Sequence, residues 1–288
     1  SGMNNWTRSS APYSGMVKKV LNSNGYPDLT GTFSAPLDYL FNEYDSTTEG
    51  ASKVEGKKAY TNVDGCDANP DDAFRVNALG ARNLAMAAEE VGAKLVHIST
   101  DYVFCGAGSA PLSECETPAP KSMYGKTKLL GEQYVQQFCT HYFIVRTAWL
   151  YGYAGNNFVK TMLRLARQNG GVTVVDDQYG RLTFTKDMAE AIFHLLDSHA
   201  PYGTYNLTGS GAVRNWAQIA SRVFELTNGN GEKVKPISTA EYFANAKAPV
   251  SPRPEHSALD LSKIKAAGYT PADWEETLEA YVNKELGK

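Results

Sequence analysis

The chain has 288 residues and a formal net charge of -3, with 42% hydrophobic and 20% charged residues. This composition is ordinary for a globular protein with a buried core, and the small acidic balance attracts neither nucleic acid nor anionic membranes. No apolar run approaches the roughly 18 residues that a membrane span needs, and the first residues lack the basic and apolar regions of a signal peptide. We therefore expect a cytoplasmic protein with no nucleic-acid partner and no membrane association.

Residues 1–58 carry the weakest pattern of the chain. Residues 17–21 could form a first strand, and the stretch after them is rich in turn-forming residues such as Gly25, Pro27 and Gly31. A dinucleotide-binding turn requires closely spaced glycines, so that backbone N–H groups can approach a pyrophosphate at a helix N-terminus. Gly25 is the candidate for such a turn, and a surface loop is the alternative.

From residue 69 onward, helix and strand patterns alternate. The sequence predicts helices at 69–92 and 122–138, strands at 94–100 and 143–148, and a loop rich in Gly, Ser and Pro at 106–120. Asn69 followed by Pro70 is typical of a helix N-cap and first position. This alternation predicts an α/β fold of the Rossmann-like kind, with a parallel sheet and helices on both faces.

The second half continues the alternation less regularly. It predicts helices at 158–168, 185–198, 213–227, 240–246, 261–267 and 271–285, and strands at 172–175 and 204–208, with Thr185 as an N-cap. We expect residues 1–150 to form a dinucleotide-binding domain. Residues 151–288 should form mainly a smaller α/β substrate-binding region.

Tyr124 and Lys128 form the strongest chemical pattern. They lie four residues apart on the predicted helix 122–138, so both side chains leave the same face. A free tyrosine has a pKa of about 10, and a neighbouring ammonium should lower that pKa by stabilising the phenolate. The pair suits proton transfer to or from a sugar or alcohol oxygen. A chance pattern on a solvated helix is the alternative.

Two hydroxyl residues, Ser99 and Thr100, stand at the end of the predicted strand 94–100. Ligands of open α/β sheets lie at the carboxyl ends of the strands, so either hydroxyl could bind a substrate oxygen beside Tyr124. Alternatively, these hydroxyls only cap the turn that follows.

Several segments together resemble the dTDP-4-dehydrorhamnose reductase family of the extended short-chain dehydrogenase/reductase superfamily. The segments are Ile98-Ser-Thr-Asp-Tyr-Val-Phe104, Tyr124-Gly-Lys-Thr-Lys-Leu-Leu-Gly-Glu132, Arg146-Thr-Ala-Trp-Leu-Tyr-Gly152, the stretches 155–163 and 177–183, and Arg253-Pro-Glu-His-Ser-Ala-Leu-Asp260. The resemblance extends from about residue 59 to the C-terminus. Its segments favour the reductase over related nucleotide-sugar epimerases and dehydratases, which tend to be longer.

The resemblance implies an oxidoreductase that uses NADPH or NADH to reduce the 4-keto group of a dTDP-linked 6-deoxyhexose, giving dTDP-L-rhamnose. Tyr124 would be the general acid, Lys128 its partner and a ligand of the cofactor ribose, and Thr100 a donor to the substrate oxygen. Ala59, Tyr60, Thr61 and Ser99 would lie beside the cofactor. Asp101, Tyr102, Trp149, Gln178 and Arg253 are candidates for substrate binding, and Ser257 falls in the same half; Trp149 could instead be a core residue.

Two departures from the family leave a second class of function open. The glycine-rich N-terminal turn is missing, and Cys105 stands where the family usually has aspartate. A catalytically silent binding or regulatory protein with this fold is therefore the alternative to an enzyme. The sequence indicates no metal site, although Mg²⁺ bound by surface carboxylates is left open, as is a homodimer.

Overall fold

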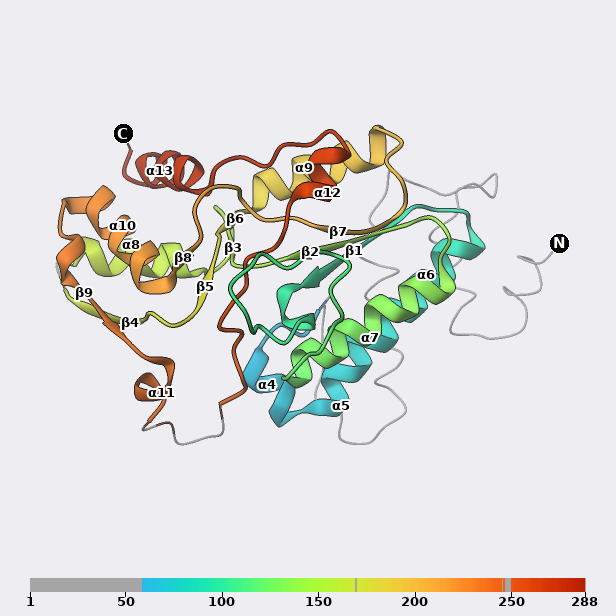
Figure 1. Ribbon diagram of the computed structural model, residues 1–288, viewed down its shortest axis with the longest axis horizontal. Helices are drawn as coiled ribbons and strands as arrows, with labels where there is room; N and C mark the ends of the chain where they lie inside the picture. The colour runs from blue at the N-terminus through green and yellow to red at the C-terminus, as the bar shows by residue number, and fades with distance from the viewer. Residues whose placement is uncertain (1–58, 169, 245, 247–249, 288) are drawn as a thin grey trace.

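The computed structural model describes residues 59–168, 170–244, 246 and 250–287 (Figure 1). The expected first strand at 17–21 and the candidate cofactor residue Gly25 lie outside the described residues.

A three-stranded parallel sheet forms the centre of one half of the molecule. Its order is β1 (Leu95–Thr100), β2 (Tyr142–Thr147) and β7 (Gly203–Asn206). Thr100 is paired with Thr147, so β1 and β2 end at the same level. This common edge is where a parallel sheet binds its ligands.

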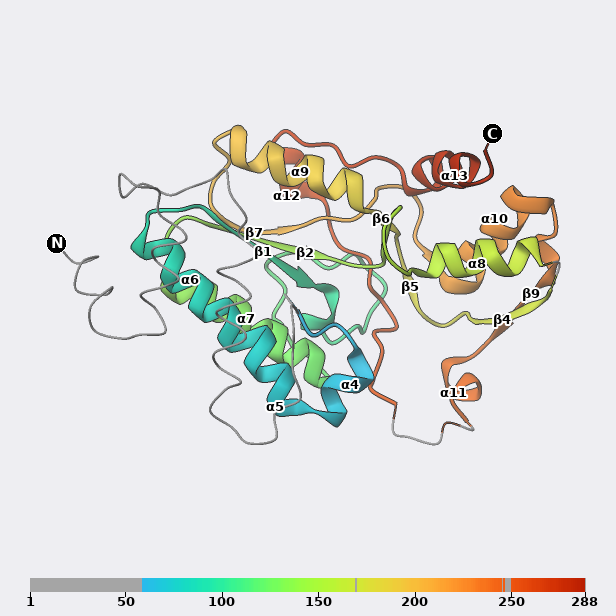
Figure 2. The ribbon, with the colours of Figure 1, turned by 180° about the vertical axis from the view of Figure 1, so that it is seen from behind.

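Helices cover both faces of this sheet, as Figures 1 and 2 show. Ile144 packs with α6 (Gly80–Glu90) and α7 (Met123–Phe138). Its neighbours Phe143 and Val145 pack on the opposite face with α9 (Thr185–Asp197) and α12 (Ser262–Ala266). Successive side chains of a strand point to opposite faces, so the continuous apolar run of β2 supplies both cores. The predicted α/β fold is confirmed.

The helical segment before β1 differs from its prediction in two ways. An additional helix, α4 (Val63–Ala68), precedes α5 (Pro70–Ala73), and the π-helical turn Phe74–Leu79 joins α5 to α6. Asn69 was expected to cap this segment, but its side chain donates to Gly65 O of α4. The cap that forms is Asn62, which accepts from Gly65 N at 3.0 Å. The predicted cap at Thr185 is also wrong, because that residue is the first of α9 and follows Phe184.

The other half has its own apolar core. It is built from α8 (Phe158–Arg167), α10 (Trp216–Asn228), α13 (Trp274–Glu285) and the parallel pair β4 (Val172–Val175) and β9 (Val234–Ile237). The short helix α11 (Thr239–Tyr242) follows β9. The helices α8, α10 and α13 and strand β4 confirm the predicted elements, whereas β9 was not predicted.

Two pairs of two-residue strands occur where the chain passes from one half to the other. β3 (Leu150–Tyr151) pairs with β6 (Thr183–Phe184), and β5 (Tyr179–Gly180) pairs with β8 (Arg214–Asn215). Within the described ranges, no helix is long and apolar enough to cross a membrane. All four cysteines have free thiols.

Candidate active site

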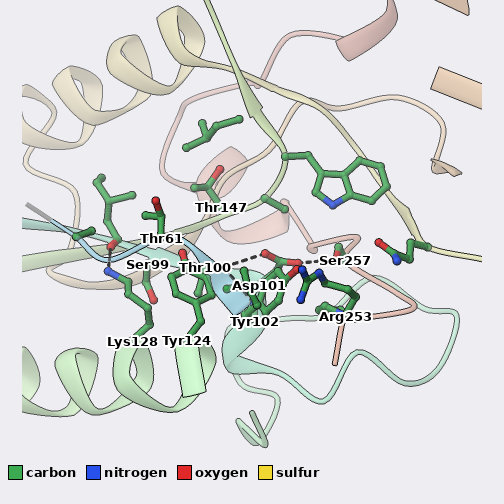
Figure 3. Close-up of a pocket in the computed structure, with 18 of the residues that line it drawn as sticks. Thr61, Ser99, Thr100, Asp101, Tyr102, Tyr124, Lys128, Thr147, Arg253 and Ser257 are labelled. Atoms are coloured by element: carbon green, nitrogen blue, oxygen red, sulfur yellow. Dashed lines mark hydrogen bonds between the residues drawn. The ribbon is translucent and has the colours of Figure 1, made fainter. Parts of the chain in front are cut away.

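A cavity of about 610 Å³ lies at the carboxyl ends of β1 and β2 (Figure 3). Residues from both halves of the chain line it. They are Ala59, Thr61, Val63, Ile98, Ser99, Thr100, Asp101, Tyr102, Tyr124, Lys128, Thr147, Ala148, Trp149, Leu150, Gln178, Trp216, Arg253, Pro254 and Ser257.

The end of β1 and the residue that follows it place Ser99, Thr100 and Asp101 in the cavity wall. Thr100 Oγ1 donates to Asp101 Oδ1 at 3.0 Å and accepts from Tyr102 N at 3.2 Å. Ser257 Oγ donates to the other carboxylate oxygen of Asp101 (Figure 3). The Asp101 side chain is thereby buried in a closed hydrogen-bond group, and burial raises its pKa to about 6.

Helix α7 brings Tyr124 against this strand end. Ser122 caps the helix by accepting from Gly125 N at 3.2 Å. A Cβ at Gly125 would lie 2.2 Å from Tyr102 O, so glycine alone allows the helix to approach this closely. The ring of Tyr124 then meets the ring of Tyr102 edge-on, with centroids 5.3 Å apart. The glycine inside the Tyr124–Lys128 motif therefore has a packing role.

The pKa of Tyr124 moves in the direction opposite to the prediction. Burial raises it, while a hydrogen bond with the Thr100 side chain lowers it. The expected lowering by Lys128 is wrong, because the Lys128 ammonium is directed to Ile98 O, at 2.6 Å from Nζ. A raised pKa keeps the Tyr124 hydroxyl protonated, which is the state of a proton donor.

Lys128 is almost fully buried at 4% exposure. Burial lowers its pKa to about 8, against the opposing charge of Glu132 one turn further along α7. Glu132 is itself buried and bonds Arg146 of β2, with Arg146 Nη2 2.7 Å from Glu132 Oε2. Helix α7 is thus fixed to the sheet by a buried ion pair that the sequence did not reveal.

Asn77 holds the segment that enters the cavity from the N-terminal side. Its Oδ1 accepts from Tyr60 N at 2.8 Å, and its Nδ2 donates to Tyr60 O and to Thr127 Oγ1 of α7. Tyr60 therefore faces Asn77 with its backbone, while its neighbours Ala59 and Thr61 line the cavity. The π-helical turn that carries Asn77 gave no signal in the sequence.

Arg253 closes the cavity from the C-terminal segment. Its guanidinium forms a bidentate pair with Asp64 of α4, at 3.0 Å to Oδ1 and 2.7 Å to Oδ2. Arg253 holds the pKa of Asp64 below its usual value, and Ser251 N also donates to this carboxylate. This ion pair joins residues 189 positions apart, and Arg253 lies beside Tyr102 in Figure 3.

Two aromatic side chains, Trp149 and Trp216, form another wall of the cavity. Trp149 follows β2 with a left-handed φ of 51° and stacks on Trp216, with ring centroids 3.8 Å apart. Phe158 packs on the ring of Trp216, and their ring centroids are 4.4 Å apart. A Cβ at Gly180 would lie 2.9 Å from the Trp149 ring, so this glycine makes room for the stack. Trp216 is a cavity residue that sequence reasoning missed.

A second cavity of about 400 Å³ adjoins this aromatic wall. It shares Gln178, Trp216 and Arg253 with the first cavity and is otherwise lined mainly by apolar side chains of α8 and β4 and by Tyr242 and Phe243. Gln178 Nε2 donates to Thr239 Oγ1 at 2.9 Å, which ties this wall to α11.

The structure brings most of the predicted site residues together. Those that line the first cavity are Ala59, Thr61, Ser99, Thr100, Asp101, Tyr102, Tyr124, Lys128, Trp149, Gln178, Arg253 and Ser257; Tyr60 does not line it. Among the described residues, no group of three or more His, Cys, Asp and Glu side chains could hold a metal ion.

Comparisons with known proteins agree with this geometry. The family model described as RmlD substrate binding domain matches residues 52–286. Spore coat polysaccharide biosynthesis protein SpsK of Bacillus subtilis is 39% identical over 231 residues, which is 80% of this chain and 78% of that protein. The dTDP-4-dehydrorhamnose reductase of Streptomyces griseus is 41% identical over 218 residues, 74% of this chain and 70% of that protein.

Solved structures show the same likeness. A dTDP-4-dehydrorhamnose reductase from Bacillus anthracis in complex with NADP superposes with a TM-score of 0.73 at 36% identity, covering 93% of this chain and 88% of that one. Fold and site together define a Rossmann-like enzyme of the extended short-chain dehydrogenase/reductase class. Within that class, the chain belongs to the dTDP-4-dehydrorhamnose reductase family.

Proposed function

We propose that the protein reduces the 4-keto group of a dTDP-linked 6-deoxyhexose with NADPH or NADH, giving dTDP-L-rhamnose. The observation that carries this proposal is the placement of Thr100, Tyr124 and Lys128 in one cavity at the strand ends of a chain of this family. A hydroxyl pair and a buried ammonium there suit protonation of a sugar oxygen.

The described residues fit the reactive end of a nicotinamide cofactor. Ser99 lines the cavity together with Lys128. Its Oγ atom is buried and has no hydrogen-bond partner in the part of the chain that the structure describes. An unpaired buried hydroxyl is costly unless a ligand satisfies it. Ser99, Lys128 and the extended segment around Ala59 and Thr61 would hold this end of the cofactor. When bound, the reduced nicotinamide supplies the hydride for the ketone carbon.

Tyr124 donates the proton that the substrate oxygen needs as negative charge develops on it. Its raised pKa means that the hydroxyl is protonated across the neutral range. Thr100 lines the same cavity as this hydroxyl, and Lys128 places a positive charge there. Preorganised donors of this kind stabilise a forming oxyanion without reorganisation of solvent.

The second cavity would take the nucleotide part of the substrate. Its apolar and aromatic lining suits a base, and Arg253 lies at the junction of both cavities, where a diphosphate would connect base and sugar. Substrate binding would then fall mainly to residues 151–288. A cytoplasmic location and a homodimer stay predictions.

Two optical measurements on the full chain test the function. NADPH is added first, and nicotinamide fluorescence reports binding. The dTDP-4-keto-6-deoxyhexose is added next, and falling nicotinamide absorbance reports turnover. Absence of cofactor binding would support a silent binding protein, and binding without oxidation would support a different substrate.

A further inference from the structure

Positive charge is scarce in the walls of the two cavities. Of the described residues that line them, Lys128 and Arg253 are the only cations. The Lys128 ammonium is directed to Ile98 O and lies beside Tyr124 in the first cavity (Figure 3). Arg253 lines both cavities. It is therefore the cation that a diphosphate would meet if it joined a base in one cavity to a sugar in the other.

The hydrogen bonds of Arg253 leave one edge of its guanidinium open. Nη1 donates to Asp64 Oδ1 at 3.0 Å and to Ser251 O at 2.9 Å, and Nη2 donates to Asp64 Oδ2 at 2.7 Å. The Nε hydrogen and the second Nη2 hydrogen have no partner among the residues that the structure describes. Because the group is planar, these two hydrogens leave the same edge side by side.

An edge with two parallel N–H donors has a defined chemical complement. It matches two oxygens of a phosphate group, and this fork geometry is what distinguishes arginine from lysine as a phosphate ligand. The position of Arg253 at the junction of the cavities, its charge and its open edge all fit a diphosphate.

Asp64 decides which edge of the guanidinium stays open. Its carboxylate occupies the end formed by Nη1 and Nη2, and it also accepts from Ser251 N at 2.9 Å. Ser251 Oγ donates to Val63 O at 3.2 Å, so the backbone before Arg253 is held by the same start of α4. The hydrogen bond from Arg253 keeps the pKa of Asp64 below its usual value, so the carboxylate is ionised at neutral pH.

We propose, on the basis of the function proposed above, that Asp64 is a positioning residue that holds Arg253 with its Nε and Nη2 edge toward the diphosphate of the sugar nucleotide. Asp64 itself lines neither cavity, so it acts through Arg253. An arginine that is ordered before the substrate arrives loses little conformational freedom on binding. The expected effect of Asp64 is therefore on binding and not on the reduction step.

Calorimetric titration of the cofactor-free protein with dTDP tests this role. Asp64→Asn keeps the size of the side chain but loses the charged pair, so Kd for dTDP should rise roughly 3- to 10-fold, the scale of ordering one long side chain on binding. Arg253→Lys keeps the charge but lacks the two-donor edge, and Kd should rise about 10-fold or more. If Asp64 only offset the charge of Arg253, Asp64→Asn would bind dTDP more tightly, and this result would overturn the proposal.

Thymidine separates positioning of the diphosphate from general damage to the site, because it has the base but no phosphate. Its Kd, measured by ligand-observed NMR, should be the same for Asp64→Asn and the wild type. Equal weakening of thymidine and dTDP would contradict the positioning role. Asp72→Asn is the matched control, because Asp72 also pairs with an arginine, Arg75, but lines neither cavity. This variant should bind dTDP as the wild type does.

Turnover distinguishes failure of this proposal from failure of the proposed function. In an active enzyme, Asp64→Asn should raise KM for the sugar nucleotide by the same factor as Kd for dTDP and leave kcat within about twofold. If the wild type binds dTDP but oxidises no NADPH, the proposed function fails while the dTDP comparison still decides the role of Asp64. If the wild type turns over and Asp64→Asn binds dTDP with the wild-type Kd, the positioning role fails and the function stands.

Discussion

The two walls of the cavity are built from different chemistry. The wall formed by β1, β2 and α7 carries the buried side chains of Asp101 and Lys128, and the buried ion pair of Glu132 and Arg146 joins α7 to β2 without lining the cavity. The other wall is the stacked pair of Trp149 and Trp216, and Phe158, which lines the second cavity, packs on Trp216. We expect the first wall to hold the proton donors and the second to bind the substrate. Substitutions on the first wall should therefore change kcat, and those on the second should change KM.

Tyr124→Phe should produce the largest effect on the polar wall. Loss of the donor hydroxyl should lower kcat by about 10² to 10⁴-fold with little change in KM, because general acid catalysis is lost while binding is kept. Steady-state kinetics would measure this. Tyr134→Phe on the same helix, away from the cavity, is the control and should turn over normally. Near-normal turnover by Tyr124→Phe would remove the assignment of the proton donor.

Glu132→Gln tests whether the polar wall depends on its buried ion pair. Removal of one partner leaves the Arg146 charge buried, so the free energy of unfolding should fall by about 3 kcal/mol. Urea denaturation would measure the loss. Glu190→Gln, which removes an exposed pair with Lys186, should cost less than about 1 kcal/mol. Equal losses in the two variants would contradict the importance of burial.

Lys128→Met should separate stability from activity. The folded-state pKa of Lys128 is about 8 against an ordinary value of 10.5, so the charged lysine destabilises the fold at all pH values below 8. This penalty disappears as the pH rises from 8 to 10.5, and stability should rise over that window. At pH 7 the methionine variant should therefore gain on the order of 1–3 kcal/mol while losing activity.

Thermal melts at pH 7 and pH 10 would show this pattern for Lys128. The gain of the methionine variant over the wild type should shrink at the higher pH. Lys126→Met, at an exposed neighbouring position, should show no such dependence. A lower melting temperature for Lys128→Met at both pH values would refute the claim.

Trp216→Ala should give the smallest effect, on the aromatic wall. Loss of one stacked ring should raise KM for the sugar nucleotide by roughly 3- to 10-fold, the scale of an aromatic pair, and leave kcat nearly unchanged. Phe193→Ala, which removes a ring that is 64% exposed on α9, is the control. A fall in kcat equal to the rise in KM would show that the two walls do not divide their tasks.

Periodicity in the sequence predicted the elements that local patterns determine. The helix of Tyr124 and Lys128 and the strand ending at Thr100 have the expected bounds within one residue, because cap, apolar face and spacing all lie within the segment. Strand β9 escaped prediction because it is four residues long and contains Pro236, which is normally unfavourable within a sheet.

The site could be predicted only as a set of candidates. Residue types and the order of strand ends indicated Thr100, Tyr124 and Lys128, whereas their partners come from far along the chain. Ser257 bonds Asp101 across 156 positions, and Asn77 bonds Thr127 across 50. No local pattern encodes such contacts. The same is true of the Tyr124 pKa, since burial, which raises it, follows from the whole fold.

The pair of Asp64 and Arg253 has a consequence for biosynthesis. Its two residues are separated by most of the described chain, and they bring the Ser251–Ser257 segment to the cavity. Proteins are made from the N-terminus, so β1, β2 and α7 are synthesised well before this segment. In a nascent chain the cavity would stay open on one side until residues 251–257 arrive, and activity should require nearly the whole chain, because α12 and α13 complete the two cores after that segment.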